Sequence, residues 1–174
     1  MLVFVNKKEV LKETVDYVKD TLGKESTGHD WWHVYRVWKT AVYIAKKEKR
    51  GDLFIIHLGA LLHDIADWKF HDEREGERRA REWLEKKKVD FEIIDHVCHI
   101  INNISFKGAH VKFQLNSIEG KIVQDADRLD AIGAIGIARV FATSAHLKHL
   151  LYDPSVKPAS HKSFKDYKKS YTAI

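Results

Sequence analysis

The chain has 174 residues, 44% of them hydrophobic and 32% charged, which suits a single domain over residues 1–174 and excludes a disordered chain. Its net charge of +5 comes without a long block of lysine and arginine, so nucleic acid is not the expected partner, and no apolar stretch is long enough to span a membrane. The single cysteine, Cys98, excludes an intrachain disulfide and fits a reducing, cytoplasmic setting.

Apolar residues recur at three- and four-residue spacing along most of the chain, and both prolines lie near its end. This pattern predicts an all-α bundle of about six or seven helices. The first helix is expected over 9–22, closed by Gly23, and the second over about 28–49, with Thr27 as its N-cap. The third, over 53–66, is apolar on almost every side and should form the buried centre.

Two helices and a loop are predicted for the next part of the chain. A strongly charged helix is expected over 73–88, and Asp90 is expected to cap an amphipathic helix that follows it. The stretch 105–116 is expected to be a loop, and either Asn116 or Ser117 should cap the helix after it.

The last predicted segments begin with an apolar helix that carries aspartates, over 122–133. A loop over 151–161 and a short last helix over 163–174 complete the chain. Small residues after the aspartate-bearing run predict a face for close helix packing, either in the core or at an interface. They are Gly133, Ala134, Gly136 and Ala138.

The dipeptide His-Asp occurs three times, in different surroundings. His63-Asp64 follows the apolar run of the third helix, where an unpaired charge is costly. His29-Asp30 begins a helix and His71-Asp72 lies in a polar stretch, so capping and solvation account for these two. The buried dipeptide therefore needs a partner, and a divalent metal ion suits imidazole and carboxylate ligands.

Two further ligands stand far away in the sequence. His33, on the preceding helix, is the natural third ligand, and Asp127, on the later apolar helix, is the natural fourth. Two histidines and two aspartates suit one divalent ion, such as Mn, Fe, Co, Ni, Zn or Mg, and leave positions for water and substrate. Adjacent residues on a straight helix point about 100° apart. His63 and Asp64 can therefore share an ion only at a helix end or a local distortion.

This arrangement resembles the HD-domain metal-dependent phosphohydrolases, whose H…HD…D pattern is matched by His33, His63-Asp64 and Asp127. The resemblance is closest to the small bacterial and archaeal hydrolases of the YpgQ/YedJ-like type. It implies an HD-domain helical bundle with a metal-site core at about 28–145. The four matching stretches, in order, are 28–37, 61–67, 104–108 and 122–133.

The resemblance implies hydrolysis of a phosphoester or phosphoanhydride bond by a metal-activated water, with a nucleotide or nucleoside triphosphate as the first expected substrate. Asp67, four residues after His63, is the candidate catalytic residue that positions or deprotonates this water; an ordinary helix-end carboxylate is the alternative. Relatives usually continue with further helices, whereas this chain stops at Ile174, which leaves open a non-catalytic nucleotide-sensing module that retains the metal.

Several side chains are candidates for binding substrate phosphate. Arg36 is favoured because it lies one turn from His33 on the same helix stripe. For the others, a surface or structural role is equally open, and Arg128 has the further alternative of pairing with a neighbouring aspartate. They are Lys69, Lys107 and Arg128.

Three more histidines have weaker signals. His96 and His99 are spaced to contact substrate or a second metal together, with a solvated helix face as the alternative. His29 is expected to face the site only if the second helix begins before it.

Overall fold

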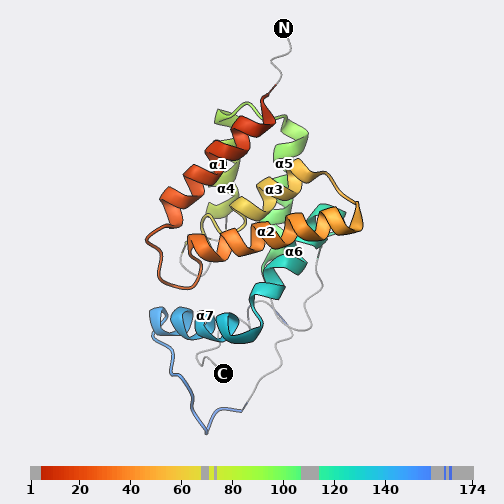
Figure 1. Ribbon diagram of the computed structural model, residues 1–174. Coiled ribbons are helices and arrows are strands. Elements are labelled where there is room, and N and C mark those ends of the chain that lie inside the picture. Colours follow the sequence, from red (N-terminus) through yellow and green to blue (C-terminus); the bar gives the residue numbers. More distant parts are fainter. Residues whose placement is uncertain are drawn as a thin grey trace.

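The computed structural model describes residues 5–67, 71–72, 74–106, 114–157, 163 and 165. Seven α-helices and no β-strand occur within these ranges, which confirms the predicted all-α fold (Figure 1). In chain order the helices are α1 Lys7–Leu22, α2 Trp31–Glu48, α3 Leu53–Leu62, α4 Glu75–Lys86, α5 Phe91–Ile104, α6 Ile118–Asp130 and α7 Gly133–His146.

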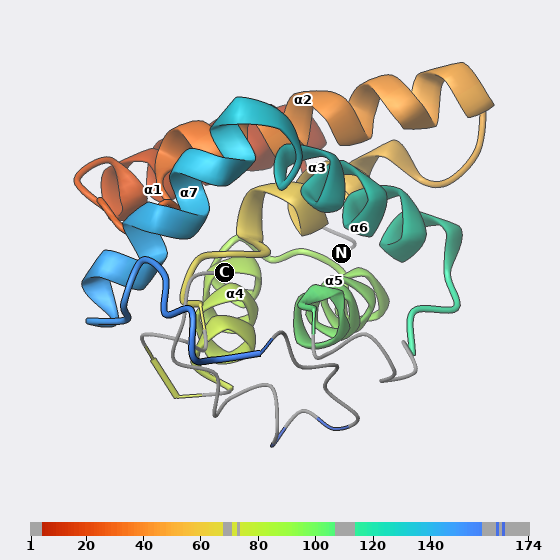
Figure 2. The ribbon, with the colours of Figure 1, turned by 90° about the horizontal axis from the view of Figure 1, so that it is seen from below.

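Helix α3 is the centre of the bundle, as its all-round apolar sequence predicts. It packs against α1, α2, α5 and α6, and the two views of the ribbon agree on this central place (Figures 1 and 2). Full burial of one side chain such as Leu61 contributes about 2 kcal/mol relative to exposure. The helix ends at Leu62, four residues before the predicted end, because a tight turn begins there with Ile65 N donating to Leu62 O at 3.2 Å.

Helix α2 begins at Trp31 and is capped by Asp30, whose Oδ1 accepts a hydrogen bond from His33 N at 2.8 Å. The predicted N-cap, Thr27, is therefore wrong. Gly28 explains the difference, because its φ of +89° lies in the left-handed region and interrupts the helix before it can form.

Other helix boundaries fall close to their predicted places. Helix α4 lies within the predicted 73–88. Asp90 occupies the N-cap position of α5, but its side chain makes no capping hydrogen bond. Of the two capping candidates for α6, Ser117 is the one used, because its Oγ accepts from Gly120 N at 3.1 Å.

The aspartate-bearing helix ends at Asp130, and a separate helix, α7, starts at Gly133 with φ +74°. This turn directs α7 away from the main bundle, and in Figure 1 it lies below the other helices. The predicted face of small residues is largely exposed. Gly136 is buried against the backbone of Ala131, but Gly133, Ala134 and Ala138 are exposed. Close packing of this face in the core of the described chain is therefore wrong, and its alternative use as an interface with another chain stays a prediction.

Residues 151–157 are not helical, in agreement with the predicted loop over 151–161. The predicted last helix, over 163–174, lies outside the described residues apart from positions 163 and 165. Among the described helices, none combines the length and the apolar character needed to cross a membrane.

Cys98 gives a direct test of this packing. Its side chain is buried in α5, and that burial raises the pKa of the thiol to about 11. Because only the thiolate is nucleophilic, we expect iodoacetamide at pH 8 to leave Cys98 unmodified in the native protein and to alkylate it fully after unfolding in urea. Mass spectrometry measures both states, and rapid alkylation of the native protein would contradict the burial of this face of α5.

Candidate metal centre

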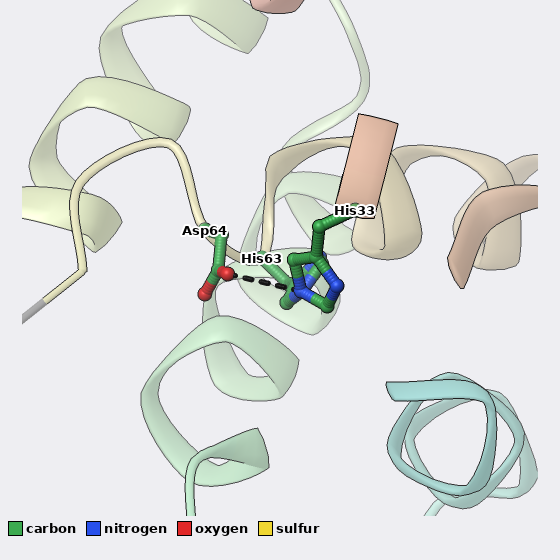
Figure 3. Close-up of side chains that lie close together, drawn as sticks. All are labelled: His33, His63 and Asp64. Carbon is green, nitrogen blue, oxygen red and sulfur yellow. Dashed lines mark hydrogen bonds and ion pairs between the residues drawn. The ribbon is translucent and has the colours of Figure 1, made fainter. Parts of the chain in front are cut away.

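Four side chains from three parts of the chain converge on one point. His33 comes from α2, His63 and Asp64 from the turn after α3, and Asp127 from α6. From His33 Nε2, the distances are 3.2 Å to His63 Nε2, 3.1 Å to Asp64 Oδ2 and 3.4 Å to Asp127 Oδ1. Figure 3 shows the first three side chains pointing toward one another.

The early end of α3 makes this convergence possible. Adjacent residues on a continuing helix would point about 100° apart. Because α3 ends at Leu62, His63 and Asp64 lie in a turn, and both reach the same space, with His63 Nε2 3.6 Å from Asp64 Oδ2. The packing of α2 and α6 against α3 brings the other two side chains to this turn.

The hydrogen bonds on the far side of each imidazole fix which ring nitrogen carries the proton. His63 Nδ1 lies 2.9 Å from the carbonyl oxygen of Ala60, which can only accept, so His63 Nδ1 is the donor. His33 Nδ1 lies 2.8 Å from Asp130 Oδ2 and donates to that carboxylate. In the neutral form of each ring, both Nε2 atoms then carry lone pairs, and they lie 3.2 Å apart beside two carboxylates.

The electrostatics of the cluster favour a positive charge at its centre. Burial alone would lower the pKa of His33, but its hydrogen bond to Asp130 and the nearby negative charge of Asp64 outweigh that and raise it. Burial alone would raise the pKa of Asp64, yet the electrostatic influence of the neighbouring imidazoles of His63 and His29 holds it well below the usual value. The cluster therefore stabilises carboxylate anions together with a cation.

The donor set and its spacing fit a divalent ion. Neighbouring ligands that lie 2.0–2.2 Å from one ion are roughly 2.8–3.6 Å apart in octahedral or tetrahedral geometry. The three distances from His33 Nε2 lie within this range, and His63 Nε2 lies 3.6 Å from Asp64 Oδ2 and 3.8 Å from Asp127 Oδ1. The Asp127 side chain is 26% exposed, so the cluster opens toward solvent on the α6 side.

Asp130 contacts His33 on the side of the ring that faces away from the cluster. Besides accepting from His33, it accepts from Arg36 Nε at 2.6 Å and Arg36 Nη2 at 3.0 Å, and Arg139 Nη1 lies 3.4 Å away. Burial would raise the pKa of Asp130, but the hydrogen bonds from His33 and Arg36 lower it to about 2. Asp130 is thus ionised near neutral pH and orients the His33 ring through Nδ1.

The substitution Asp130→Asn is expected to weaken Mn²⁺ binding by about 10- to 100-fold, because the carboxylate that orients His33 is lost while the side-chain shape is kept. Calorimetric titration of the metal-free protein measures the affinity. Asp125→Asn, an exposed position on the same helix, is the matched control. Equal affinities of the two variants would show that Asp130 does not act on the metal ligand.

His29 approaches the cluster although α2 begins after it. Its Nε2 lies 3.6 Å from Asp67 Oδ2. The prediction that His29 needs an earlier helix start was wrong, because the loop before Asp30 brings the ring to the site. Asp67 is buried and lies near Asp64, one ligand atom from each of His29, Asp64 and Asp67 falling within 4.8 Å of the others. Its role toward water stays a prediction.

The candidate phosphate-binding residues lie in different places. Arg36 lies beside the cluster and is held by Asp130. Arg128 is exposed on α6, next to Asp127 in the chain. Lys69 and Lys107 lie outside the described residues. Phosphate binding by these side chains stays a prediction.

His96 and His99, on α5, lie near the N-terminal end of α6, whereas Asp127 lies near its C-terminal end. His96 Nε2 is 3.6 Å from Glu119 Oε2, and His99 Nε2 is 3.3 Å from the carbonyl oxygen of Gln114. Eight residues of helix separate Glu119 from Asp127, which is about 12 Å. The structure does not bring these two histidines together with the candidate metal ligands.

The sequence interpretation offered a neighbouring aspartate as a partner of Arg128, but it did not identify His33 and Arg36 as the partners of Asp130. The spacing of Asp130, three residues after Asp127, was a usable signal, because it places both carboxylates on one face of α6. The contribution of Arg139 had no local signal, since it depends on the turn between α6 and α7.

Comparisons with known proteins agree with this arrangement. The family model described as HD domain matches residues 31–132. The uncharacterized protein YpgQ of Bacillus subtilis is 47% identical over 148 residues, which cover 83% of this chain and 71% of YpgQ. The crystal structure of YpgQ in complex with ADP matches with a TM-score of 0.64 and 42% identity, covering 82% of this chain and 72% of that one.

Two other solved structures are similar. A protein from Lactobacillus plantarum matches with a TM-score of 0.85 and 32% identity, covering 99% of this chain and 79% of that chain. An HD-superfamily hydrolase from Bacillus thuringiensis matches with a TM-score of 0.65 and 42% identity, covering 94% of this chain and 80% of that one.

Proposed function

Because the chain belongs to the HD domain family, we propose that it is a divalent-metal-dependent phosphohydrolase that cleaves a phosphoester or phosphoanhydride bond of a small phosphorylated substrate. One observation carries the proposal: two imidazole lone pairs and two carboxylates converge in one largely buried cluster. A nucleotide or nucleoside triphosphate is the first candidate substrate, and the ADP complex of YpgQ supports a nucleotide ligand.

Different residues of the chain would bind the ion and activate the water. His33, His63, Asp64 and Asp127 would hold the ion, which supplies a more acidic bound water and neutralises phosphoryl oxygens. Asp67, buried beside Asp64, would orient the attacking water and take its proton as the water oxygen bonds to phosphorus and the bond to the leaving oxygen breaks.

Substrate phosphate would be bound by basic side chains at the exposed side of the cluster. Arg128 follows Asp127 on α6 and is exposed. Arg36 is part of the same face through its two hydrogen bonds to Asp130, and a guanidinium in this setting keeps its positive charge.

The test is a panel of nucleoside mono-, di- and triphosphates incubated with the Mn²⁺-loaded protein, with products separated by ion-pair chromatography. We expect metal-dependent release of phosphate or pyrophosphate from at least one compound, and the products identify the bond that is cleaved. An absence of turnover over the whole panel, or equal turnover by the wild type and by Asp127→Ala, would reject the proposal.

A second candidate function is a nucleotide-sensing module that retains the ion without turnover. The crystal structure of YpgQ in complex with ADP, a relative with a bound nucleotide, favours it. Tight nucleotide binding by calorimetry, with no product after prolonged incubation, would support this function, and measurable hydrolysis would reject it.

A further inference from the structure

We propose that the outer face of α2 binds single-stranded nucleic acid, with bases stacked on its exposed rings and phosphates bound by its lysines. Three aromatic and two basic side chains follow one another at three- and four-residue spacing and therefore share one side of the helix. They form the α2 face: Trp32, Tyr35, Lys39, Tyr43 and Lys46. Such binding goes beyond the proposed hydrolysis, because it needs neither the metal cluster nor a bound ion.

The α2 face is open to solvent. Trp32 and Tyr43 are each 62% exposed, and Lys39 and Lys46 are exposed as well. Helices α3 and α6 pack against α2, and Figure 2 shows α2 along one edge of the bundle. From Trp32 to Lys46 the face is roughly 21 Å long, which matches about six nucleotides at the 3.4 Å spacing of a stacked strand.

Positive charge dominates the α2 face. The one carboxylate within α2 belongs to Glu48, which lies about 180° around the helix from Lys39. Among the described residues, neither Lys39 nor Lys46 forms an ion pair with a carboxylate. Burial and the charges of these two lysines lower the pKa of His57 on α3, so their positive potential reaches the neighbouring helix. The net charge of the chain is modest, but the fold presents these cations together on one face.

The aromatic rings are held in position before any ligand binds. The ring centroids of Trp32 and Tyr35 are 5.9 Å apart, and those of Tyr35 and Trp38 are 6.1 Å apart. Trp38 is fixed because its Nε1 donates a hydrogen bond to His57 Nδ1 at 2.6 Å. Lys39 Nζ lies 4.3 Å from the centroid of the Trp38 ring and 5.3 Å from that of Tyr35. A preorganised row of rings and cations loses little conformational entropy on binding.

This combination of rings and cations favours a single strand over other polyanions. A single strand exposes the faces of its bases together with its phosphates, whereas a duplex hides the base faces that Trp32 and Tyr43 would stack on. A helix that binds an anionic membrane inserts an apolar face between the lipids. The aliphatic side chains Val34, Val37 and Ala41 of α2 are instead buried in the core of the protein.

Fluorescence anisotropy tests the proposal with the full chain at low salt, in chelator, so that no metal ion recruits the phosphates to the cluster. The probes are labelled oligothymidylate and oligouridylate of about twelve nucleotides, a duplex of the same length and vesicles that contain phosphatidylserine. We expect binding of a single strand, DNA or RNA, that is tighter than binding of the duplex. The logarithm of the association constant should fall with the logarithm of the salt concentration, with a slope of about −1.4 or steeper for two neutralised phosphates.

A pair of double variants tests the lysines. Lys39→Gln combined with Lys46→Gln should weaken binding and make the salt slope shallower by about 1.4. Lys12→Gln combined with Lys19→Gln removes the same charge from exposed positions on α1 and should leave the slope unchanged.

A pair of single variants tests the rings. Trp32→Ala should weaken single-strand binding by about 5- to 150-fold, which is the loss expected for one stacked base. Phe91→Ala removes a ring that is 67% exposed on α5 and should keep the wild-type affinity.

An absence of binding to both single strands at low salt would overturn the proposal, as would equal binding of the duplex or binding of the vesicles alone. Unchanged affinity and salt slope in the lysine and tryptophan variants of α2 would overturn it too. The wild-type measurements decide even if a variant fails to fold, which circular dichroism reveals. Nucleotide hydrolysis without single-strand binding would reject the α2 face and keep the proposed function. Single-strand binding without hydrolysis of any nucleotide would do the reverse.

Discussion

Replacing His63 by alanine is expected to lower the turnover of the metal-loaded protein by about 1000-fold or more. The substitution removes one of two imidazole lone pairs from the cluster and leaves His33 Nε2 without its neighbour at 3.2 Å. A metal ion contributes several kcal/mol to stabilising a phosphoryl-transfer transition state, and about 4 kcal/mol corresponds to about 1000-fold in rate.

Turnover should be measured at saturating Mn²⁺ for the substrate that the nucleotide panel identifies. His146→Ala removes an imidazole from an exposed position at the end of α7 and should retain full turnover. A His63→Ala protein that is folded and within tenfold of the wild-type rate would show that the cluster is not the catalytic centre.

Adding Mn²⁺ to the chelator-treated protein is expected to raise Tm by about 5–11 °C. Lone pairs and carboxylates that face one another across 3.1–3.4 Å repel, and an ion converts this repulsion into bonding. An ion at 100 times its Kd stabilises the native state by about 2.7 kcal/mol, and each kcal/mol shifts Tm by about 2–4 °C in a chain of this size.

Differential scanning calorimetry with chelator or with Mn²⁺ measures this shift. In Asp127→Ala most of the shift should disappear, because Asp127 supplies one of the two carboxylates of the cluster. Asp125→Asn, on the exposed face of the same helix, should keep it. A Tm of the wild-type protein that does not respond to Mn²⁺ would contradict ion binding in the folded state.

The centre of the fold and the convergence of four side chains were predictable because each depends on a local signal. Helix α3 is apolar on every side, so it had to be buried. A His-Asp pair at the end of such a helix needs compensation, and that need pointed to His33 and Asp127. The sequence analysis expected this helix to run to residue 66 and required a helix end or a local distortion at His63-Asp64. The structure ends the helix at Leu62, four residues earlier than expected.

The start of α2 and the role of His29 were not predictable, because both depend on contacts with α7. Thr27 and Asp30 are each good capping residues, and a local pattern does not choose between them. The choice follows from the left-handed backbone of Gly28, which is in contact with Arg139 across more than one hundred residues of sequence. A residue just before a helix can therefore lie at a site where helical spacing alone would not place it.

The break between α6 and α7 could also not be predicted from the local sequence. The run after Asp127 stays apolar and rich in small residues, which suits one long helix as well as two. Asp130 ends α6 where its carboxylate meets His33 and Arg36 from the distant helix α2 and Arg139 from the next helix, α7. The break is thus fixed by the site as much as by the local sequence.

The most direct test of the central claim is nucleotide hydrolysis measured during a stepwise addition of Mn²⁺ to the metal-free protein. If the cluster of His33, His63, Asp64 and Asp127 is a hydrolytic metal centre, turnover should be absent without the ion and should rise as bound Mn²⁺ fills the cluster. Turnover that is the same with and without Mn²⁺, or no turnover at full occupancy, would contradict this account.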